Sequence, residues 1–80
     1  MHELSLCEGI LRIIEKQAVQ EKFTRVERVR VVLGSLSGVS EEALAFCFPS
    51  VVKNTVADQA ELVFVRTEDN AFRVMDLDVV

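Results

Sequence analysis

The sequence lacks several features that would assign a function directly. It has no tryptophan or tyrosine, one proline, one histidine and two cysteines among its 80 residues. The cysteines form no CxxC pair, and the chain contains no GxSxG, no HExxH and no phosphate-binding glycine loop. These are the commonest signatures of hydrolases, zinc proteases and nucleotide-binding proteins, so composition alone indicates no enzyme.

Positive charge and long apolar runs are also scarce. The formal net charge is −4, which argues against nucleic acid as a partner because phosphate neutralisation requires a basic surface. No apolar run approaches the roughly 20 residues of a membrane span. His2 and Glu3 stand where a signal peptide carries lysines, and the cysteine usage suits a reducing compartment. We therefore expect a cytoplasmic protein that contacts no membrane.

The composition that remains is that of one small globular domain spanning residues 1–80. Half of the residues are apolar and 28% are charged, which excludes a disordered chain. A domain of this size buries only about 60% of the surface of its unfolded chain. Its core must come from aliphatic side chains and five phenylalanines.

Two segments have the apolar period of an amphipathic helix, residues 3–21 and about 40–54. The buried stripes are predicted to contain Leu4, Cys7, Ile10, Leu11, Ile14 and Ala18 in the first, and Leu44, Phe48 and Val51, flanked by Cys47 and Val52, in the second.

The ends of these helices carry local signals. Ser5 followed by Glu8 fits a capping box, although a start one turn earlier is an alternative. Ser40 is predicted to be the N-cap of the second helix. Asn54 is a candidate left-handed residue at its end, and Pro49 should kink it.

Three segments alternate between apolar and polar residues as strands do: 25–33, 60–66 and 72–80. In the last strand Met75, Leu77 and Val79 are predicted to face inward. The polar stretch 67–71 has the length of a hairpin loop. This order predicts an α+β fold, in which two helices pack on one face of a small three-stranded mixed sheet.

Two pairs of residues need an interpretation. Cys7 and Cys47 lie on apolar helix faces, where cysteine behaves as a small hydrophobe, so packing is favoured over metal ligation or a disulfide. Arg28 and Arg30 lie on the outer face of their strand. We interpret them as part of a solvated sheet surface or edge, with a docking patch for an acidic partner as the alternative.

Met1, His2 and Glu3 form a candidate metal site, although a histidine at position 2, considered by itself, more often has no metal role. A free terminal amine, the His2 amide nitrogen and the His2 imidazole can close two adjacent chelate rings on one ion. Loss of the amide proton produces a nitrogen-rich, nearly planar donor set, which suits Ni(II) or Cu(II). The Glu3 amide, or less favourably its carboxylate, supplies the fourth donor.

The chain resembles the HypA family of nickel metallochaperones. The resemblance rests on its opening residues 1–7, on Gly34-Ser35-Leu36-Ser37-Gly38-Val39, and on the segments 42–44 and 46–48. It covers residues 1 to about 66 and resumes weakly at 72–80. It implies the family's nickel-binding domain, with nickel bound by Met1, His2 and Glu3.

The sequence differs from that family in one respect, the absence of the zinc module. Family members carry two CxxC pairs between the last two strands, whereas residues 67–71 occupy that place here. We therefore expect Ni(II) but no zinc.

The resemblance implies a non-enzymatic metallochaperone that supplies [NiFe] hydrogenase, and in some organisms urease. Its partners would be a HypB-type GTPase, the hydrogenase large subunit and, where urease is served, urease accessory proteins. The alternative is a metal-free adaptor that docks the GTPase without delivering nickel.

The first prediction concerns zinc. We expect the protein to fold without structural zinc, because a structural site needs four cysteine or histidine ligands and neither CxxC pair is present. Elemental analysis of the purified protein checks this. Zinc at one per chain, with unfolding upon chelation, would contradict it.

Overall fold

The computed structural model describes residues 3–80 and contains two helices and three strands. The elements are α1 (Glu3–Glu21), β1 (Val26–Gly34), α2 (Glu41–Val52), β2 (Glu61–Thr67) and β3 (Phe72–Val79). Their order and type agree with the predicted helices and strands. In this part of the chain no helix is both long and apolar enough to cross a membrane.

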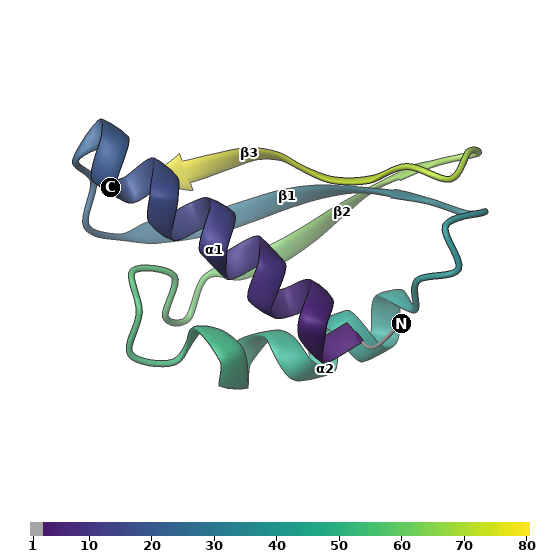
Figure 1. Cartoon of the computed structure of the whole chain (residues 1–80), viewed down its shortest axis with the longest axis horizontal. Coiled ribbons are helices and arrows are strands. Elements are labelled where there is room, and N and C mark those ends of the chain that lie inside the picture. Colours follow the sequence, from purple (N-terminus) through teal and green to yellow (C-terminus); the bar gives the residue numbers. More distant parts are fainter. Residues whose placement is uncertain (1–2) are drawn as a thin grey trace.

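The sheet has the strand order β2-β1-β3. β1 pairs with β2 in parallel and with β3 in antiparallel fashion, so the sheet is mixed, as predicted. Both helices lie on the same side of the sheet (Figure 1). The predicted α+β architecture is therefore confirmed.

The predicted hairpin between the last two strands is wrong, because β1 lies between β2 and β3. β1 is the most buried strand, and in the centre it makes hydrogen bonds along both of its edges. On the outer face of β1, Arg28 forms ion pairs with both neighbouring strands, with Glu61 on β2 at 2.9 Å and with Asp78 on β3 at 2.6 Å. The short segment after β2 therefore crosses the end of β1 and does not fold back on β2.

This crossing link packs tightly against Gly34, the last residue of β1. Gly34 donates its N–H to the carbonyl of Ala71 at 2.7 Å, and Ser35 donates to Thr67 at 2.9 Å. A Cβ atom at Gly34 would lie 2.1 Å from the backbone oxygen of Asp69. Glycine is needed here because the link passes where a side chain would stand.

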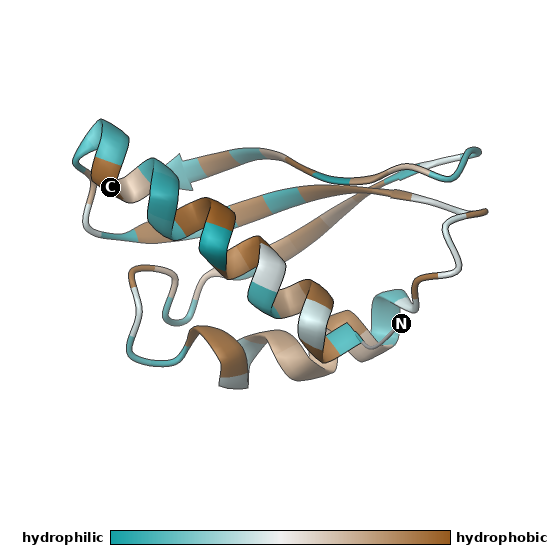
Figure 2. Ribbon diagram, in the orientation of Figure 1, coloured by the Kyte–Doolittle hydropathy of each residue, from teal (hydrophilic) through white to brown (hydrophobic). Residues whose placement is uncertain are grey.

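The core lies between the two helices and the sheet. Its centre is formed by side chains that are almost fully buried, namely Cys7, Ile10 and Ile14 of α1, Val26, Val29 and Val31 of β1, Leu44, Phe48 and Val52 of α2, and Ala57. Figure 2 shows apolar residues along the side of α1 that faces the sheet, with polar residues between them. The helical period thus predicted most of this core.

Two details of α1 differ from the prediction. The helix includes Glu3, so Ser5 lies within it and is not an N-cap, and the alternative of an earlier start is correct. Leu4, which the helical period predicts to be buried, is 51% exposed. Leu11 packs at the edge of the core and is only partly buried.

The ends of α2 follow the sequence signals. The Ser40 hydroxyl accepts the N–H of Ala43 at 3.1 Å, which is the predicted N-cap. The helix continues through Pro49 to Val52. Asn54 has a φ of 64°, so the predicted left-handed residue after the helix is confirmed.

The inward position of Met75 is a further wrong prediction. Arg30 pairs with Asp76 while Val31 pairs with Val74, which leaves Met75 as an extra residue in β3. Such a bulge reverses the alternation of side chains. Val74 and Leu77 therefore pack on the core, and Met75 is 49% exposed. Val79, at the end of β3, is 44% exposed.

The crossing link generates the second prediction. Gly34→Ala should destabilise the fold by about 3 kcal/mol, the upper end of typical overpacking costs, because the obstructing atoms belong to the backbone. Gly9→Ala is the matched control. Its new methyl group would meet only the Arg12 side chain at 3.9 Å, and alanine is favoured in a helix by roughly 0.5–1 kcal/mol. Urea unfolding of both variants measures the difference, and equal effects would contradict the role of Gly34.

Candidate metal centre

Of the three predicted metal-binding residues, Met1 and His2 lie outside the described residues. Glu3 is the first residue of α1. The candidate site can therefore be built from Glu3 and the elements that surround it.

The Glu3 carboxylate joins the starts of the two helices. Its Oε2 accepts the backbone N–H of Ser40, the N-cap of α2, at 3.2 Å. Both helices begin at the same end of the molecule (Figure 1). A carboxylate is stabilised at a helix N-terminus by the helix dipole, and here one carboxylate lies beside two such ends. The contact holds the first turn of α1 against the loop that precedes α2.

The start of α2 is in turn fixed to the sheet. Glu41 accepts hydrogen bonds from both Nε and Nη2 of Arg66 on β2, the first at 2.8 Å. Through Glu3, Ser40 and Glu41, the start of α1 is connected to α2 and then to β2. The first turn of α1 is therefore braced against the rest of the fold.

Side chains of the described residues do not form a metal site by themselves. Within residues 3–80, no group of three or more histidine, cysteine, aspartate or glutamate residues is arranged to hold an ion. The Glu3 carboxylate is already engaged with Ser40. The Glu3 amide nitrogen belongs to the first turn of α1, where metal ligation breaks no intrahelical hydrogen bond.

Cys7 packs in the core, as predicted. It is fully buried, and its thiol donates a weak hydrogen bond to the carbonyl of Leu44 at 3.6 Å. Burial, followed by the proximity of Cys47, raises the pKa of Cys7 from 9.0 to about 11. Thiolate is the metal-binding form of cysteine, so this environment disfavours ligation. Neither cysteine forms a disulfide, and Cys47 is partly buried.

Arg28 and Arg30 are paired within the chain. Arg30 contacts Asp76 and Asp78, each at 2.9 Å, and Arg28 contacts Asp78 and Glu61. Hydrogen bonds from Arg30 and then Arg28 lower the pKa of Asp78. The predicted solvated sheet surface is therefore correct, and these internal acids already occupy the place of an acidic partner.

Comparison with known proteins identifies the family of this chain. The family model described as hydrogenase/urease nickel incorporation metallochaperone, HypA, matches residues 1–72. The chain belongs to the HypA family. The match includes the opening residues and the Gly34–Val39 segment, which carried the resemblance seen in the sequence.

Individual relatives agree with this assignment. The hydrogenase maturation factor HypA of Alkalilimnicola ehrlichii is 47% identical over 72 residues, which are 90% of this chain and 64% of the relative. HypA 2 of Bradyrhizobium diazoefficiens is 44% identical over the same coverage. The chain thus spans less than two thirds of the length of these HypA proteins.

The fold also matches a solved structure. The solution structure of the Ni metallochaperone HypA from Helicobacter pylori superimposes with a TM-score of 0.89 at 17% sequence identity. The alignment covers 100% of this chain and 98% of that chain. At this level of identity the similarity establishes the HypA fold.

Sequence reasoning missed the two contacts that brace the site. Glu3 and Ser40 are 37 positions apart, and Glu41 and Arg66 are 25 apart. No periodicity or motif connects residues at such separations. Only the packing of α1 against α2, and of α2 beside β2, brings them together.

The buried thiol generates the third prediction. Because the folded pKa of Cys7 is raised to about 11, the folded state favours the protonated thiol. Its contribution to stability should be complete below pH 9 and should be lost as the pH rises through about 11. Cys7→Ala should flatten this part of the profile of unfolding free energy against pH, whereas Cys47→Ala should leave the fall in place. An unchanged profile in Cys7→Ala would contradict the assignment.

Proposed function

We propose that this chain is a nickel carrier for the maturation of [NiFe] hydrogenase, and that it binds one Ni(II) through Met1, His2 and Glu3. The observation that carries the proposal is the position of Glu3. It lies at the start of α1, and its carboxylate is held by Ser40 at the start of α2. Glu3, the third of the proposed ligand residues, is thereby held at a defined point of the fold.

The chemistry of the donors supports a site of this kind. The terminal amine, the His2 imidazole and the amide nitrogens of His2 and Glu3 provide four nitrogens around the ion. Two lost amide protons balance the charge of Ni(II), so the complex is neutral. A neutral complex meets no repulsion from the positive ends of the helix dipoles. The contact of the Glu3 carboxylate with Ser40 favours the Glu3 amide as the fourth donor.

A carrier must also release its cargo. A chelate at a chain end can be approached by a partner more readily than a buried site can, which suits transfer. The exposed side of α1, with Glu8 and Glu15, is available for docking next to the site. We propose a HypB-type GTPase as the docking partner and the large subunit of the hydrogenase as the recipient. Family members that serve urease would meet urease accessory proteins at the same place.

Residues 1–80 would then act as a single nickel-binding domain without a zinc module. The link at 67–71 stands where longer family members carry that module, and it is closed by its hydrogen bonds to Gly34 and Ser35. A carrier of this kind works in the cytoplasm and catalyses no reaction of its own. The proposed donors all belong to the first three residues, so nickel binding requires no donor atom from the link.

The fourth prediction tests the site. Ni(II) should bind at one per chain to protein that keeps Met1 as a free amine, and His2→Ala should abolish binding while the far-UV circular dichroism stays unchanged. Binding should weaken steeply as the pH falls, because the amide nitrogens must lose their protons. Calorimetric titration with and without an added N-terminal residue measures this, since blocking the amine removes the chelate.

Glu3→Ala distinguishes the possible fourth donors. The variant retains the amide nitrogen and loses the carboxylate that accepts from Ser40. We expect nickel still to bind at one per chain, with a loss of stability of about 1 kcal/mol from the missing hydrogen bond. Complete loss of binding in Glu3→Ala would assign the donor to the carboxylate. Normal binding in His2→Ala would contradict the site and favour the metal-free adaptor.

A further inference from the structure

The carboxyl end of β2 is joined to the start of α2 by an ion pair between Arg66 and Glu41. The Nε of Arg66 donates to one carboxylate oxygen of Glu41 at 2.8 Å, and its Nη2 donates to the other. Within residues 3–80 this is the one ion pair between a helix and the sheet, since the others join strands. Two hydrogen bonds from one guanidinium fix the orientation of a carboxylate as well as its distance.

This ion pair adds little to the stability of the fold. The Arg66 side chain is 71% exposed and the Glu41 side chain 34%. Exposed pairs contribute little to stability because water and salt screen their charges. The effect of the pair is therefore expected in the geometry of the residues next to Glu41.

Apolar packing alone does not fix the start of α2. A hollow of about 200 Å³ lies beside it, lined by Arg66, Glu41, Val39 and residues at the ends of β1 and β2. Val39 packs at the edge of the core, but apolar contacts are not directional. The first residues of α2 therefore have room to move unless Arg66 holds Glu41.

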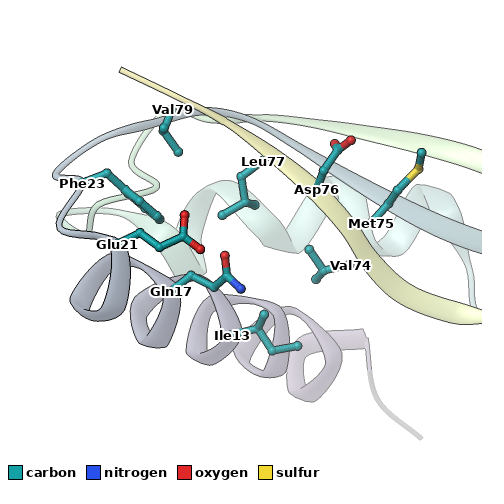
Figure 3. Close-up of a pocket in the computed structure, with 9 residues that line it drawn as sticks. All are labelled: Ile13, Gln17, Glu21, Phe23, Val74, Met75, Asp76, Leu77 and Val79. Carbon is teal, nitrogen blue, oxygen red and sulfur yellow. The ribbon is translucent and has the colours of Figure 1, made fainter.

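The amino half of α1 depends in turn on α2. Figure 3 shows Ile13 and Gln17 of α1 facing Val74 and Leu77 of β3, which fixes the middle of the helix on the sheet. Glu3 lies about 15 Å further along the helix axis, at 1.5 Å per residue, and its carboxylate contacts the loop before α2. The direction of the first turn of α1 is thus determined by where the start of α2 is held.

Ser40 connects Glu41 to Glu3. It directly precedes Glu41 and caps α2 by accepting the N–H of Ala43 at 3.1 Å. Its own backbone N–H donates to the Glu3 carboxylate at 3.2 Å, which is the long end of the usual range for such a bond. Because this N–H belongs to the backbone, a small displacement of Glu41 is enough to break the bond.

We propose that Arg66 is a positioning residue for nickel. Through Glu41 and Ser40 it holds the Glu3 carboxylate, and this contact keeps the Glu3 amide in the orientation that ligation requires. The inference rests on the nickel site proposed above. Arg66 supplies no donor atom, so its loss changes how readily the site assembles and not which atoms bind the ion. Such preorganisation raises affinity by lowering the cost of ordering the ligands.

Exchange of the Ser40 amide proton with water, measured by NMR on the metal-free protein, tests the geometry without nickel. Arg66→Gln removes the charge and should raise this exchange rate by about threefold, the scale of a lost exposed ion pair. The midpoint of urea unfolding should change little, which separates this effect from a general loss of structure. Arg73→Gln is the matched control. Arg73 is an exposed arginine on β3 that forms no ion pair among the described residues, so its loss should leave Ser40 unchanged.

Competition with a chelator tests the role in nickel binding. Arg66→Gln should raise the dissociation constant for Ni(II) by about threefold, whereas Arg73→Gln should not change it. The absorption band of the bound nickel should be the same in the parent and both variants, because the donor atoms are the same. Combining Glu41→Arg with Arg66→Glu should restore the protection of Ser40 and the affinity beyond either single variant.

The outcomes separate the two proposals. Arg66→Gln with the Ser40 exchange rate of the parent would overturn the positioning role, as would faster exchange with an unchanged nickel affinity. A double variant no better than the single variants would also overturn it, because the ion pair would then have no part in the effect. A parent protein that binds no nickel would instead overturn the proposed function, and the role of Arg66 in binding with it.

Discussion

The fold depends on the pairing of β1 along both of its edges. This strand contributes buried residues on its helix-facing side, and on the other side it carries the two arginines that bind acids on both neighbours. Because it is central, the two flanking strands can be joined only across its carboxyl end. Gly34 occupies that end, and its missing side chain provides the space through which the link passes. Sheet order, ion pairs and the position of the link are therefore consequences of one arrangement.

The same arrangement orients the helices. α2 connects two parallel strands and so must run back along the sheet, which brings its start close to the carboxyl end of β1. α1 packs beside it, with Cys7 against Leu44. The amino ends of α1 and α2 then lie together, and the Glu3 carboxylate lies beside both of them. The packing thus holds the first turn of α1 against the start of α2.

Local pattern predicted much of this structure. The helical period of α1 identified Cys7 and Ile14 correctly, and alternation located all three strands. Strand order was not accessible, because a short polar link between two strands is the usual mark of a hairpin. The bulge at Met75 has no sequence signature, since it arises from the register with β1. The contact of Glu3 with Ser40 depends on packing between distant segments, and no local rule reports it.

The link after β2 has a further consequence for the evolution of this architecture. Its two ends are separated by a whole strand, about 10 Å at the usual spacing, and each end is held by strand pairing with β1. An insertion here lengthens a surface loop without moving either anchor, and the entropic cost of such lengthening grows slowly. Two separated anchors also restrict rotation more than the closely spaced ends of a hairpin do. This position can therefore accept or lose an entire module while the sheet below keeps its register.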